Sequence, residues 1–440
     1  MKSDLPKVLQ PLAGKPLLGH VVSRARTLNP SSMHVVYGHG GDAVRAALAK
    51  ENLQWALQAE QLGTGHAVMQ AMPNVADDEL VLVLYGDVPL VRADTLKQLI
   101  DAAGEQSMSL LTVMLDNPAG YGRIVRDARG AIQEIVEQKD ASKAQLEIRE
   151  GNSGIMTVPA KLLRQWLGQL ENTNAQGEYY LTDVIAMAVK DKVKVTPLIA
   201  PTLAEVLGVN DKVQLAELEA MNRAERAREL MIAGATLADP ARIDVRAEVT
   251  LGRDVFIDAN VLLEGKVTLG DRVRVGPNVV LRDVTIGADS VIHPNSVLEQ
   301  SEFASGCLVG PYARIRPGSK LGANTHVGNF VELKKTTLGE GSKANHLTYL
   351  GDTVVGKGVN IGAGTITCNY DGANKFTTTI EDGAFIGSGN MLVAPLRIGK
   401  DATTGAGSTI TKDAPEGQLT LTRGKQMTLE GWRRPEKKPR

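Results

Sequence analysis

From about Leu251 onward, a small aliphatic residue recurs at every sixth position, with Gly, Asn or Asp at turn positions in between. The repeat is visible in VFIDAN, VLLEGK, VTLGDR and VRVGPN, and it continues with interruptions to TITKDA near Thr409. A period of six matches neither a helix nor a simple alternating strand. It matches short parallel strands joined by tight turns, because each rung then buries its aliphatic corner on its neighbours. The pattern predicts a left-handed parallel β-helix of hexapeptide repeats.

Residues 1–210 show a different pattern, in which strand-like and helix-like segments alternate. Apolar runs at 31–38, 79–87, 107–115 and 154–160 predict strands, and 42–51 and 93–104 have helical spacing. Such alternation is typical of a mostly parallel sheet covered by helices, as in Rossmann-like α/β domains.

One long amphipathic helix is predicted over 211–233, where apolar residues at helical spacing alternate with many charges. Gly234 and Pro240 are expected to end it. The chain therefore divides into an α/β domain over 1–210, a linker helix over 211–236 and a β-helix domain over 237–440.

Composition excludes several classes of partner. The net charge is -1 and the pI is about 6.7, so nothing favours nucleic acid or an anionic membrane. The two cysteines, Cys307 and Cys368, indicate no disulfide framework. No apolar run is long enough to span a bilayer, and the first residues lack the apolar core of a signal peptide. We expect a soluble, cytoplasmic protein that acts on small molecules.

A candidate phosphate site lies in the first domain. Asp87 directly follows a continuous apolar run, which places its carboxylate at the carboxyl end of a strand, where ligands of open α/β sheets bind. Gly63, Thr64 and Gly65 precede a helix and offer backbone N–H groups to an anion. Together they predict a phosphorylated ligand with a hard cation, although Asp87 alone could simply close a turn.

The repeats are interrupted by polar residues between Pro311 and Lys375, where a coil needs none. Acyl transfer to an amine needs a base and donors for an oxyanion, and His346 is the candidate base. Arg316 and Lys334 are suited to anchoring a phosphate. The alternatives are a hydrogen-bonded turn histidine and solvated surface cations.

Longer motifs resemble a known family. SDLPKVL, LQAEQLGTGHA, LYGDVPL, GYGRIV and GEYYLTDVI resemble the first half, and HVGNFVELKK, SKANHLTYLGD and NIGAGTITCNYDGANK the second half, of bacterial bifunctional UDP-N-acetylglucosamine pyrophosphorylase / glucosamine-1-phosphate N-acetyltransferases. The resemblance implies acetyl transfer from acetyl-CoA to glucosamine 1-phosphate. It also implies uridylyl transfer from UTP to N-acetylglucosamine 1-phosphate, with release of pyrophosphate.

The resemblance also implies roles for residues of the first domain. Asp87 and Asn210 would hold Mg²⁺, and Lys7 would contact phosphate. The residues implied around UTP and the nucleotide sugar are Lys7, Gln58, Gly63, Thr64, Tyr85, Gly86, Asp87, Gly122, Glu137, Asn152 and Asn210.

For acetyl transfer the resemblance supports His346 as base and places the oxyanion at a backbone amide near Ala363. The residues implied for glucosamine 1-phosphate are Arg316, Lys334, Tyr349, Asn360 and Lys375. Those implied for acetyl-CoA are Ala363, Asn369, Tyr370, Ser388, Ala406 and Arg423. The family forms homotrimers through the β-helix, with sites between subunits, so Arg423 and the basic tail RRPEKKPR are candidates for contacts with a neighbouring subunit's CoA.

The family's first strand and Gly-rich loop lie ahead of the segment that matches SDLPK. We therefore expect the natural polypeptide to begin upstream of Met1, and we expect two flanking strands to lack a partner here. One alternative is an enzyme with acetyl transfer only. Two others are a zinc hydratase that uses His293, His326 and His346, and a trimeric scaffold without catalysis.

Overall fold

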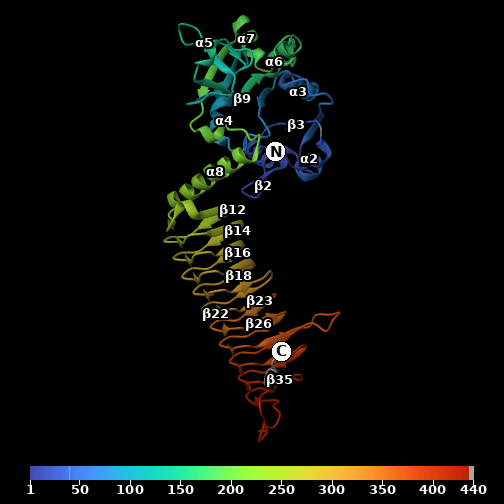
Figure 1. The fold of residues 1–440 in the computed structure, drawn as a ribbon, viewed down its shortest axis with the longest axis vertical. Helices are drawn as coiled ribbons and strands as arrows, with labels where there is room; N and C mark the ends of the chain where they lie inside the picture. The colour runs from blue at the N-terminus through green and yellow to red at the C-terminus, as the bar shows by residue number, and fades with distance from the viewer. Residues whose placement is uncertain (39, 436–440) are drawn as a thin grey trace. The chain divides into compact units, whose positions relative to one another are not determined.

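The computed structural model describes residues 1–38 and 40–435, in two compact units, Met1–Asn222 and Arg223–Arg440 (Figure 1). The first is an α/β unit and the second a coil of parallel strands, which confirms the predicted fold class. Helix α8 (Lys212–Ile232) is the predicted linker helix, and it ends before Gly234, whose φ of 103° is left-handed. The domain limits predicted at 210 and 236 stay predictions. Within the described ranges, no helix is long and apolar enough to cross a membrane.

The α/β unit is built on a sheet in the order β10-β6-β9-β7-β8, with β5 also paired to β9. Its helices are α1 (Leu17–Arg26), α2 (Gly41–Ala47), α3 (Thr64–Ala71), α4 (Ala93–Asp101), α5 (Lys143–Leu146), α6 (Ala160–Leu167) and α7 (Asp183–Lys190). Its strands are β1 (Pro11–Leu12), β2 (Lys15–Pro16), β3 (His34–Tyr37), β4 (Gln54–Leu57), β5 (Leu80–Val83), β6 (Ser107–Met114), β7 (Arg123–Arg126), β8 (Ile132–Val136), β9 (Glu150–Pro159) and β10 (Lys194–Ile199).

The pairing in this sheet differs from the expected mostly parallel arrangement. Strands β6 and β10 are parallel, but β9 is antiparallel to β5, β6 and β7. Strand β9 runs against the direction set by the helix-linked strands. It nevertheless buries Ile155, Met156 and Val158 completely, so it belongs to the core.

Strands β3 and β4 form a separate parallel pair, and no described strand joins them to β5. A cavity of about 740 Å³ is lined by both β3 and β5, and by apolar side chains of α1 and α3. Val35 and Leu82 contribute to its wall. Within the described residues, β3 pairs only with β4 and β5 only with β9, so each of these strands lacks a partner on its other edge.

The second unit winds around three faces, all of whose strand pairs are parallel. The first face contains β11 (Thr236–Leu237), β13 (Phe256–Ile257), β15 (Arg274–Val275), β17 (Val291–Ile292), β19 (Leu308–Val309), β22 (His326–Asn329), β25 (Lys343–His346), β28 (Asn360–Ile361), β31 (Phe385–Ile386), β34 (Thr403–Thr404) and β36 (Leu419–Thr420). The second contains β20 (Arg314–Ile315), β23 (Glu332–Lys334), β26 (Tyr349–Gly351), β29 (Ile366–Cys368), β32 (Met391–Val393) and β35 (Thr409–Ile410). The third contains β21 (Lys320–Leu321), β24 (Thr337–Leu338), β27 (Thr353–Val355), β30 (Thr378–Ile380) and β33 (Leu396–Ile398).

In the early rungs, four longer strands bend across the corner between the second and third faces, which joins these two faces into one sheet. They are β12 (Ile243–Leu251), β14 (Val261–Leu269), β16 (Val280–Ile286) and β18 (Val297–Phe303). Aliphatic side chains such as Ile292 and Leu298 fill the interior and are fully buried. Truncating one of them to Ala costs roughly 2–5 kcal/mol in a packed core.

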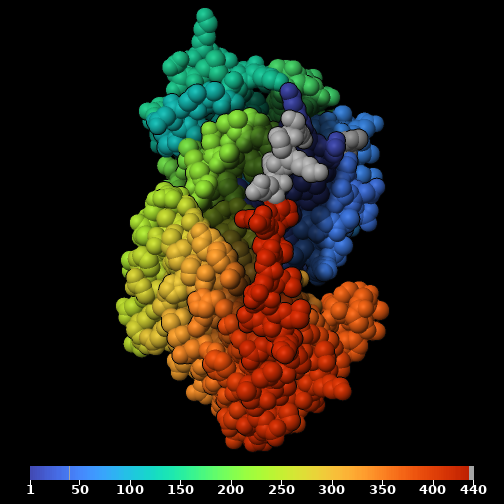
Figure 2. Space-filling view, turned by 60° about the horizontal axis from the view of Figure 1, so that its bottom comes forward, coloured from blue at the N-terminus to red at the C-terminus, as the bar shows by residue number. Residues whose placement is uncertain are grey.

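Successive rungs are offset by 17 or 18 residues, as the register of Phe256 with Arg274 and of Arg274 with Val291 shows. One step is longer, because Asn360 pairs with Phe385. The extra residues form a loop over 369–377, which projects from the rungs in Figure 1 and from the surface in Figure 2. An antiparallel bridge between Tyr370 and Lys375 closes its base.

One corner of the coil carries a column of left-handed turn residues. Early rungs use Asn there, and the Asn278 side-chain amide donates a hydrogen bond to Asn295 Oδ1 at 3.2 Å. The next three rungs place Tyr312, Phe330 and Leu347 at this position, with φ values of 56°, 57° and 47°. Left-handed backbone suits Asn but is strained for large apolar residues. We call these three residues, Tyr312, Phe330 and Leu347, the apolar corner. The folding of a single chain does not explain why large apolar residues occupy these strained turns.

Candidate functional sites

The predicted acetyl-transfer residues include one column of turn residues on successive rungs. Backbone N–H groups of the following rung donate to the carbonyls of these turn residues up to Ser388, for example from Gly364 to His346 at 3.2 Å and from Gly389 to Ala363 at 2.7 Å. Residues far apart in sequence are thereby stacked. The column consists of Asn329, His346, Ala363, Ser388 and Ala406.

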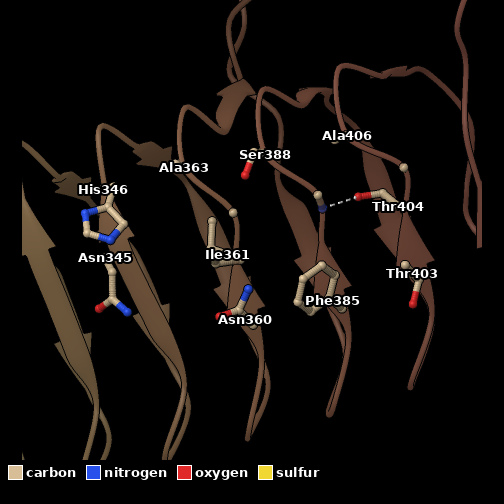
Figure 3. Close-up of a pocket in the computed structure, with 13 residues that line it drawn as sticks. Asn345, His346, Asn360, Ile361, Ala363, Phe385, Ser388, Thr403, Thr404 and Ala406 are labelled. Carbon is tan, nitrogen blue, oxygen red and sulfur yellow. Dashed lines mark hydrogen bonds between the residues drawn. The ribbon is translucent and has the colours of Figure 1, made fainter.

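A pocket of about 580 Å³ runs along this column (Figure 3). Figure 3 shows His346 at one end, with Ala363, Ser388 and Ala406 on the rungs that follow. The pocket is lined by Asn345, His346, Asn360, Ile361, Gly362, Ala363, Phe385, Gly387, Ser388, Thr403, Thr404, Gly405 and Ala406. It presents an exposed imidazole, backbone amides and small side chains, which can admit an elongated thioester.

The ring of His346 is oriented by a neighbour in the column. Its Nδ1 atom lies 2.9 Å from Oδ1 of Asn329, which occupies the same turn position one rung earlier. An amide oxygen can only accept, so this contact favours the tautomer with hydrogen on Nδ1. Nε2 then has its lone pair available to accept a proton.

Charged residues gather on the second face, on the other side of the turn that contains Leu347. Lys334 Nζ donates to Asp352 Oδ2 at 3.2 Å, and the side-chain amide of Asn369 donates to the same oxygen at 2.5 Å. Contact with the Lys375 nitrogen, followed by the Asp352 carboxylate, raises the pKa of Lys334, although burial lowers it. The same contact and the Lys334 charge lower the pKa of Lys375.

Tyr349 and Arg316 complete this second cluster. A Cβ atom on Gly351 would lie 2.4 Å from the Tyr349 hydroxyl and 2.8 Å from Nδ2 of Asn369, so only glycine lets these two groups converge. Arg316 Nη1 donates to Glu332 Oε1 at 2.8 Å, and this hydrogen bond raises the Arg316 pKa. The guanidinium is held in place and still partly exposed.

The structure does not bring all predicted acetyl-transfer residues together within one chain. Asn360 lines the pocket with His346, whereas Lys334 and Tyr349 lie on the adjoining face and do not line it. Tyr370 is exposed on the projecting loop. Arg423 lies near the pocket's far end, since Nη2 would be 3.5 Å from a Cβ on Gly405. Of the basic tail, residues 436–440 lie outside the described residues.

In the α/β unit, Lys7 lies between the two residues predicted to hold a cation. Its Nζ atom is 2.6 Å from Asp87 Oδ2 and 3.1 Å from Asn210 Oδ1. A carboxylate oxygen and an amide oxygen therefore converge on one positive charge. Lys7 lies near the start of this unit and Asn210 near its end, just before α8, so the fold joins residues from opposite ends of the unit.

The predicted nucleotide residues form a second group beside this centre. Gly63 has a φ of 108°, and a Cβ there would lie 2.7 Å from the Tyr179 carbonyl, so the turn requires glycine. Gln58 donates to the Gly63 carbonyl at 3.1 Å, and Thr64 Oγ1 accepts from the Leu181 backbone at 3.2 Å.

Tyr85 lies at the meeting point of these residues. Burial raises its pKa to about 12, the charges of Glu137 and Asp87 add to this, and a hydrogen bond with Thr64 opposes it. Its ring also lies against Gly154, where a Cβ would be 2.4 Å from Cε2. The phenol therefore stays neutral and can donate a hydrogen bond. Gly86, next in sequence, lines the cavity together with Lys7, Thr64 and Tyr85.

The residues implied for the amino sugar are also neighbours. A Cβ on Gly122 would lie 3.3 Å from the Glu137 carboxylate, and the Asn152 N–H donates to the Gly122 carbonyl at 2.8 Å. Burial, together with the carboxylates of Asp183, Asp140 and Glu178, raises the Glu137 pKa, which a hydrogen bond from Thr182 opposes.

Sequence reasoning missed two residues that the structure places in these clusters, Asn329 and Asp352. Both could have been found from rung spacing, since Asn329 precedes His346 by 17 residues and the carboxylate of Asp352 bonds a residue 18 positions earlier. Among residues 1–38 and 40–435, no group of three or more His, Cys, Asp or Glu side chains could hold a metal.

Comparisons with known proteins agree with this architecture. The profile of MobA-like NTP transferase domains matches residues 1–233. The profile of six bacterial transferase hexapeptide repeats matches 248–283, and that of the hexapeptide repeat of succinyl-transferase matches 377–412. Fold and sites thus define a two-domain transferase, in which a nucleotidyltransferase domain precedes a hexapeptide-repeat domain.

Full-length relatives identify the family. The bifunctional protein GlmU of Azoarcus sp. is 58% identical over 99% of this chain and 97% of its own length. Those of Nitrosospira multiformis and Stutzerimonas stutzeri are each 57% identical over 100% of this chain and 96% and 97% of their own lengths. The chain belongs to the GlmU family, and the resemblance inferred from its motifs is confirmed.

Proposed function

We propose that this enzyme makes UDP-N-acetylglucosamine in two steps. The coil transfers the acetyl group of acetyl-CoA to the amine of glucosamine 1-phosphate. The α/β unit then transfers uridylyl from UTP to the product and releases pyrophosphate. The observation that carries the first step is the oriented imidazole of His346 at the end of an open pocket lined by small residues.

In the first step His346 acts as general base. Nε2 accepts a proton from the attacking amine, while Nδ1–H remains bound to Asn329. Nitrogen forms its bond to the thioester carbonyl carbon, and the C–S bond breaks to release CoA. A backbone amide near Ala363 stabilises the oxyanion of the tetrahedral intermediate.

Two sets of residues bind the substrates of this step. The anchors for glucosamine 1-phosphate are Arg316, Lys334, Tyr349, Asn360 and Lys375, and their cationic members suit a phosphate. Acetyl-CoA is bound by Ala363, Asn369, Tyr370, Ser388, Ala406 and Arg423, of which Ala363, Ser388 and Ala406 line the pocket.

In the second step Lys7 neutralises and positions phosphate, and Asp87 and Asn210 would hold Mg²⁺. The donor set fits Mg²⁺, because two oxygen ligands already converge on a cation and Mg²⁺ keeps several waters or phosphate oxygens as further ligands. Bound Mg²⁺ would supply charge for the phosphoryl oxygens. The uracil is held by Gln58, Gly63 and Thr64. Tyr85 and Gly86 lie around the nucleotide and the sugar. The amino sugar is bound by Gly122, Glu137 and Asn152.

The enzyme acts as a homotrimer through its coil. The acetyl-transfer residues lie on two adjoining faces of one chain, so a neighbouring copy completes the site. The apolar corner supports this, since Tyr312 and Phe330 stack at 5.3 Å although their exposed fractions are 52% and 55%. The partners are small-molecule substrates and further copies, without nucleic acid or membrane, and a cytoplasmic location agrees with two unpaired cysteines.

Two assays on the same preparation test the proposal. Formation of a free thiol from acetyl-CoA and glucosamine 1-phosphate reports the first step, and pyrophosphate release from UTP and N-acetylglucosamine 1-phosphate reports the second. His346→Ala should lower thiol release at least about a hundredfold and leave pyrophosphate release unchanged. His326→Ala, on another rung of the same face, is the control. Unchanged thiol release in His346→Ala would contradict the role of His346 as base. Absence of thiol release in the unmodified chain would favour a non-catalytic scaffold, and a chain without pyrophosphate release would perform acetyl transfer only.

A further inference from the structure

Asp352 lies at a turn that connects two faces of the coil. Its backbone is left-handed, with a φ of 49°, and its N–H donates to the Lys334 carbonyl at 2.9 Å. The Asp352 carbonyl accepts from Thr378 of a later rung at 3.3 Å. The backbone of Asp352 is therefore fixed by hydrogen bonds to the rungs on both sides.

A single oxygen of this carboxylate joins two different side chains. Oδ2 accepts from Lys334 at 3.2 Å and from Asn369 at 2.5 Å. Lys334 and Asp352 have exposed side-chain fractions of only 14% and 16%, so solvent screens their attraction weakly. Although burial raises the Asp352 pKa, these two hydrogen bonds and the charges of Lys334 and Lys375 lower it overall.

The carboxylate also lies where two ammonium groups meet. Lys334 and Lys375 are close neighbours, and the contact with Lys334 together with its positive charge lowers the Lys375 pKa. The other titratable groups that act on this pair are Tyr349, beside Lys334, and Lys335, beside Lys375. Among these groups, Asp352 is the counter-charge that allows two lysines to share one phosphate site.

We propose that Asp352 is a positioning residue for acetyl transfer. Its carboxylate holds the side chains of Lys334 and Asn369 in a fixed relative position and offsets the combined positive charge of Lys334 and Lys375. This inference rests on the proposed function, which assigns Lys334 to the sugar phosphate and Asn369 to acetyl-CoA. One carboxylate thereby links the binding of both substrates.

Two substitutions separate charge from position. Asp352→Asn keeps an acceptor oxygen and tolerates the left-handed turn, but removes the negative charge. Asp352→Ala removes the acceptor as well. The matched controls are Asp289→Asn and Asp289→Ala, because Asp289 is also left-handed, with a φ of 63°, and its Oδ1 accepts from Arg272 at 2.6 Å one rung away.

The experiment measures KM for each substrate between about pH 7 and pH 9. In Asp352→Asn, KM for glucosamine 1-phosphate should rise more steeply with pH than in the unmodified chain, because one lysine loses its proton more readily. In Asp352→Ala, KM for acetyl-CoA should also rise about tenfold, since Asn369 loses its acceptor. The Asp289 variants should match the unmodified chain in both respects.

Two outcomes would overturn the proposal. KM values and pH dependence that match the unmodified chain, or that change equally in the Asp289 variants, remove the positioning role and leave the proposed function intact. If the unmodified chain transfers no acetyl group to glucosamine 1-phosphate, the proposed function and this inference fail together.

Discussion

The Nδ1 atom of His346 lies 2.9 Å from the Oδ1 atom of Asn329, one rung earlier in the same column. Asn329→Leu removes the polar partner that this ring nitrogen has among the described residues. We expect kcat for acetyl transfer to fall about tenfold to a hundredfold, with KM nearly unchanged, because the imidazole loses its preferred tautomer and orientation.

Asn329→Asp offers a control for this prediction, since its carboxylate also accepts from Nδ1. It should retain more activity than Asn329→Leu in the same steady-state assay. An equal loss of acetyl-transfer activity in both variants would contradict the prediction. It would show that the shape of the side chain at position 329 matters and that its hydrogen-bond acceptor does not.

Lys7→Met should lower uridylyl transfer about a hundredfold and leave acetyl transfer unchanged. The ammonium group is the positive charge that lies between Asp87 and Asn210, and phosphoryl transfer depends mainly on such charge neutralisation. Pyrophosphate release at saturating Mg²⁺ measures it. Lys50→Met, at an exposed position in the same unit, is the control, and comparable losses in both variants would contradict the assignment.

Glu137→Gln should change how stability depends on pH. Burial and three nearby carboxylates raise the Glu137 pKa above its ordinary value of 4.5, so ionisation is less favourable in the folded state than in the unfolded state. Stability is therefore lost as pH rises through the raised pKa, and Gln avoids that loss. The Tm of Glu137→Gln relative to the unmodified chain should increase from about pH 4 to pH 7.

Thermal unfolding at several pH values measures this difference, with Glu134→Gln, on the strand β8 that ends just before Glu137, as the control. A Tm difference that stays constant with pH would contradict the prediction. Uridylyl transfer should fall in Glu137→Gln even though the fold is more stable, as expected if the site keeps a destabilising carboxylate for the amino sugar.

Phe330→Asn, combined with Tyr312→Asn, should weaken association of the coil without unfolding it. Asn adopts a left-handed backbone with less strain than Tyr or Phe does. The single chain should therefore unfold at the same or a higher temperature. Loss of the exposed stack should shift the chain toward monomer in sedimentation experiments and reduce acetyl transfer. Leu57→Asn, an exposed apolar side chain of the first unit, is the control. Unchanged association would rule out this corner as the contact.

Much of the fold could be read from local pattern. The six-residue repeat predicts the coil because a buried aliphatic residue, such as Ile292, and a turn residue, such as Asn295, lie only a few residues apart in each repeat. Helix α8 and strand β6 are predictable from local pattern as well, the helix from its apolar periodicity and the strand from its continuous apolar run. The pattern did not reveal that β9 is antiparallel to its neighbours, because strand direction depends on the path of the whole chain.

The candidate sites divide in the same way. Sequence by itself determined which residue types could carry the chemistry, such as His346 as the candidate base and Asp87 at a strand end. Only the tertiary structure decided that Asn329 orients His346, that Asp352 joins Lys334 to Asn369, and that Lys7 lies between Asp87 and Asn210. The physical reason is that side chains 17 or more residues apart meet through rung stacking and strand order, which depend on how the whole chain packs.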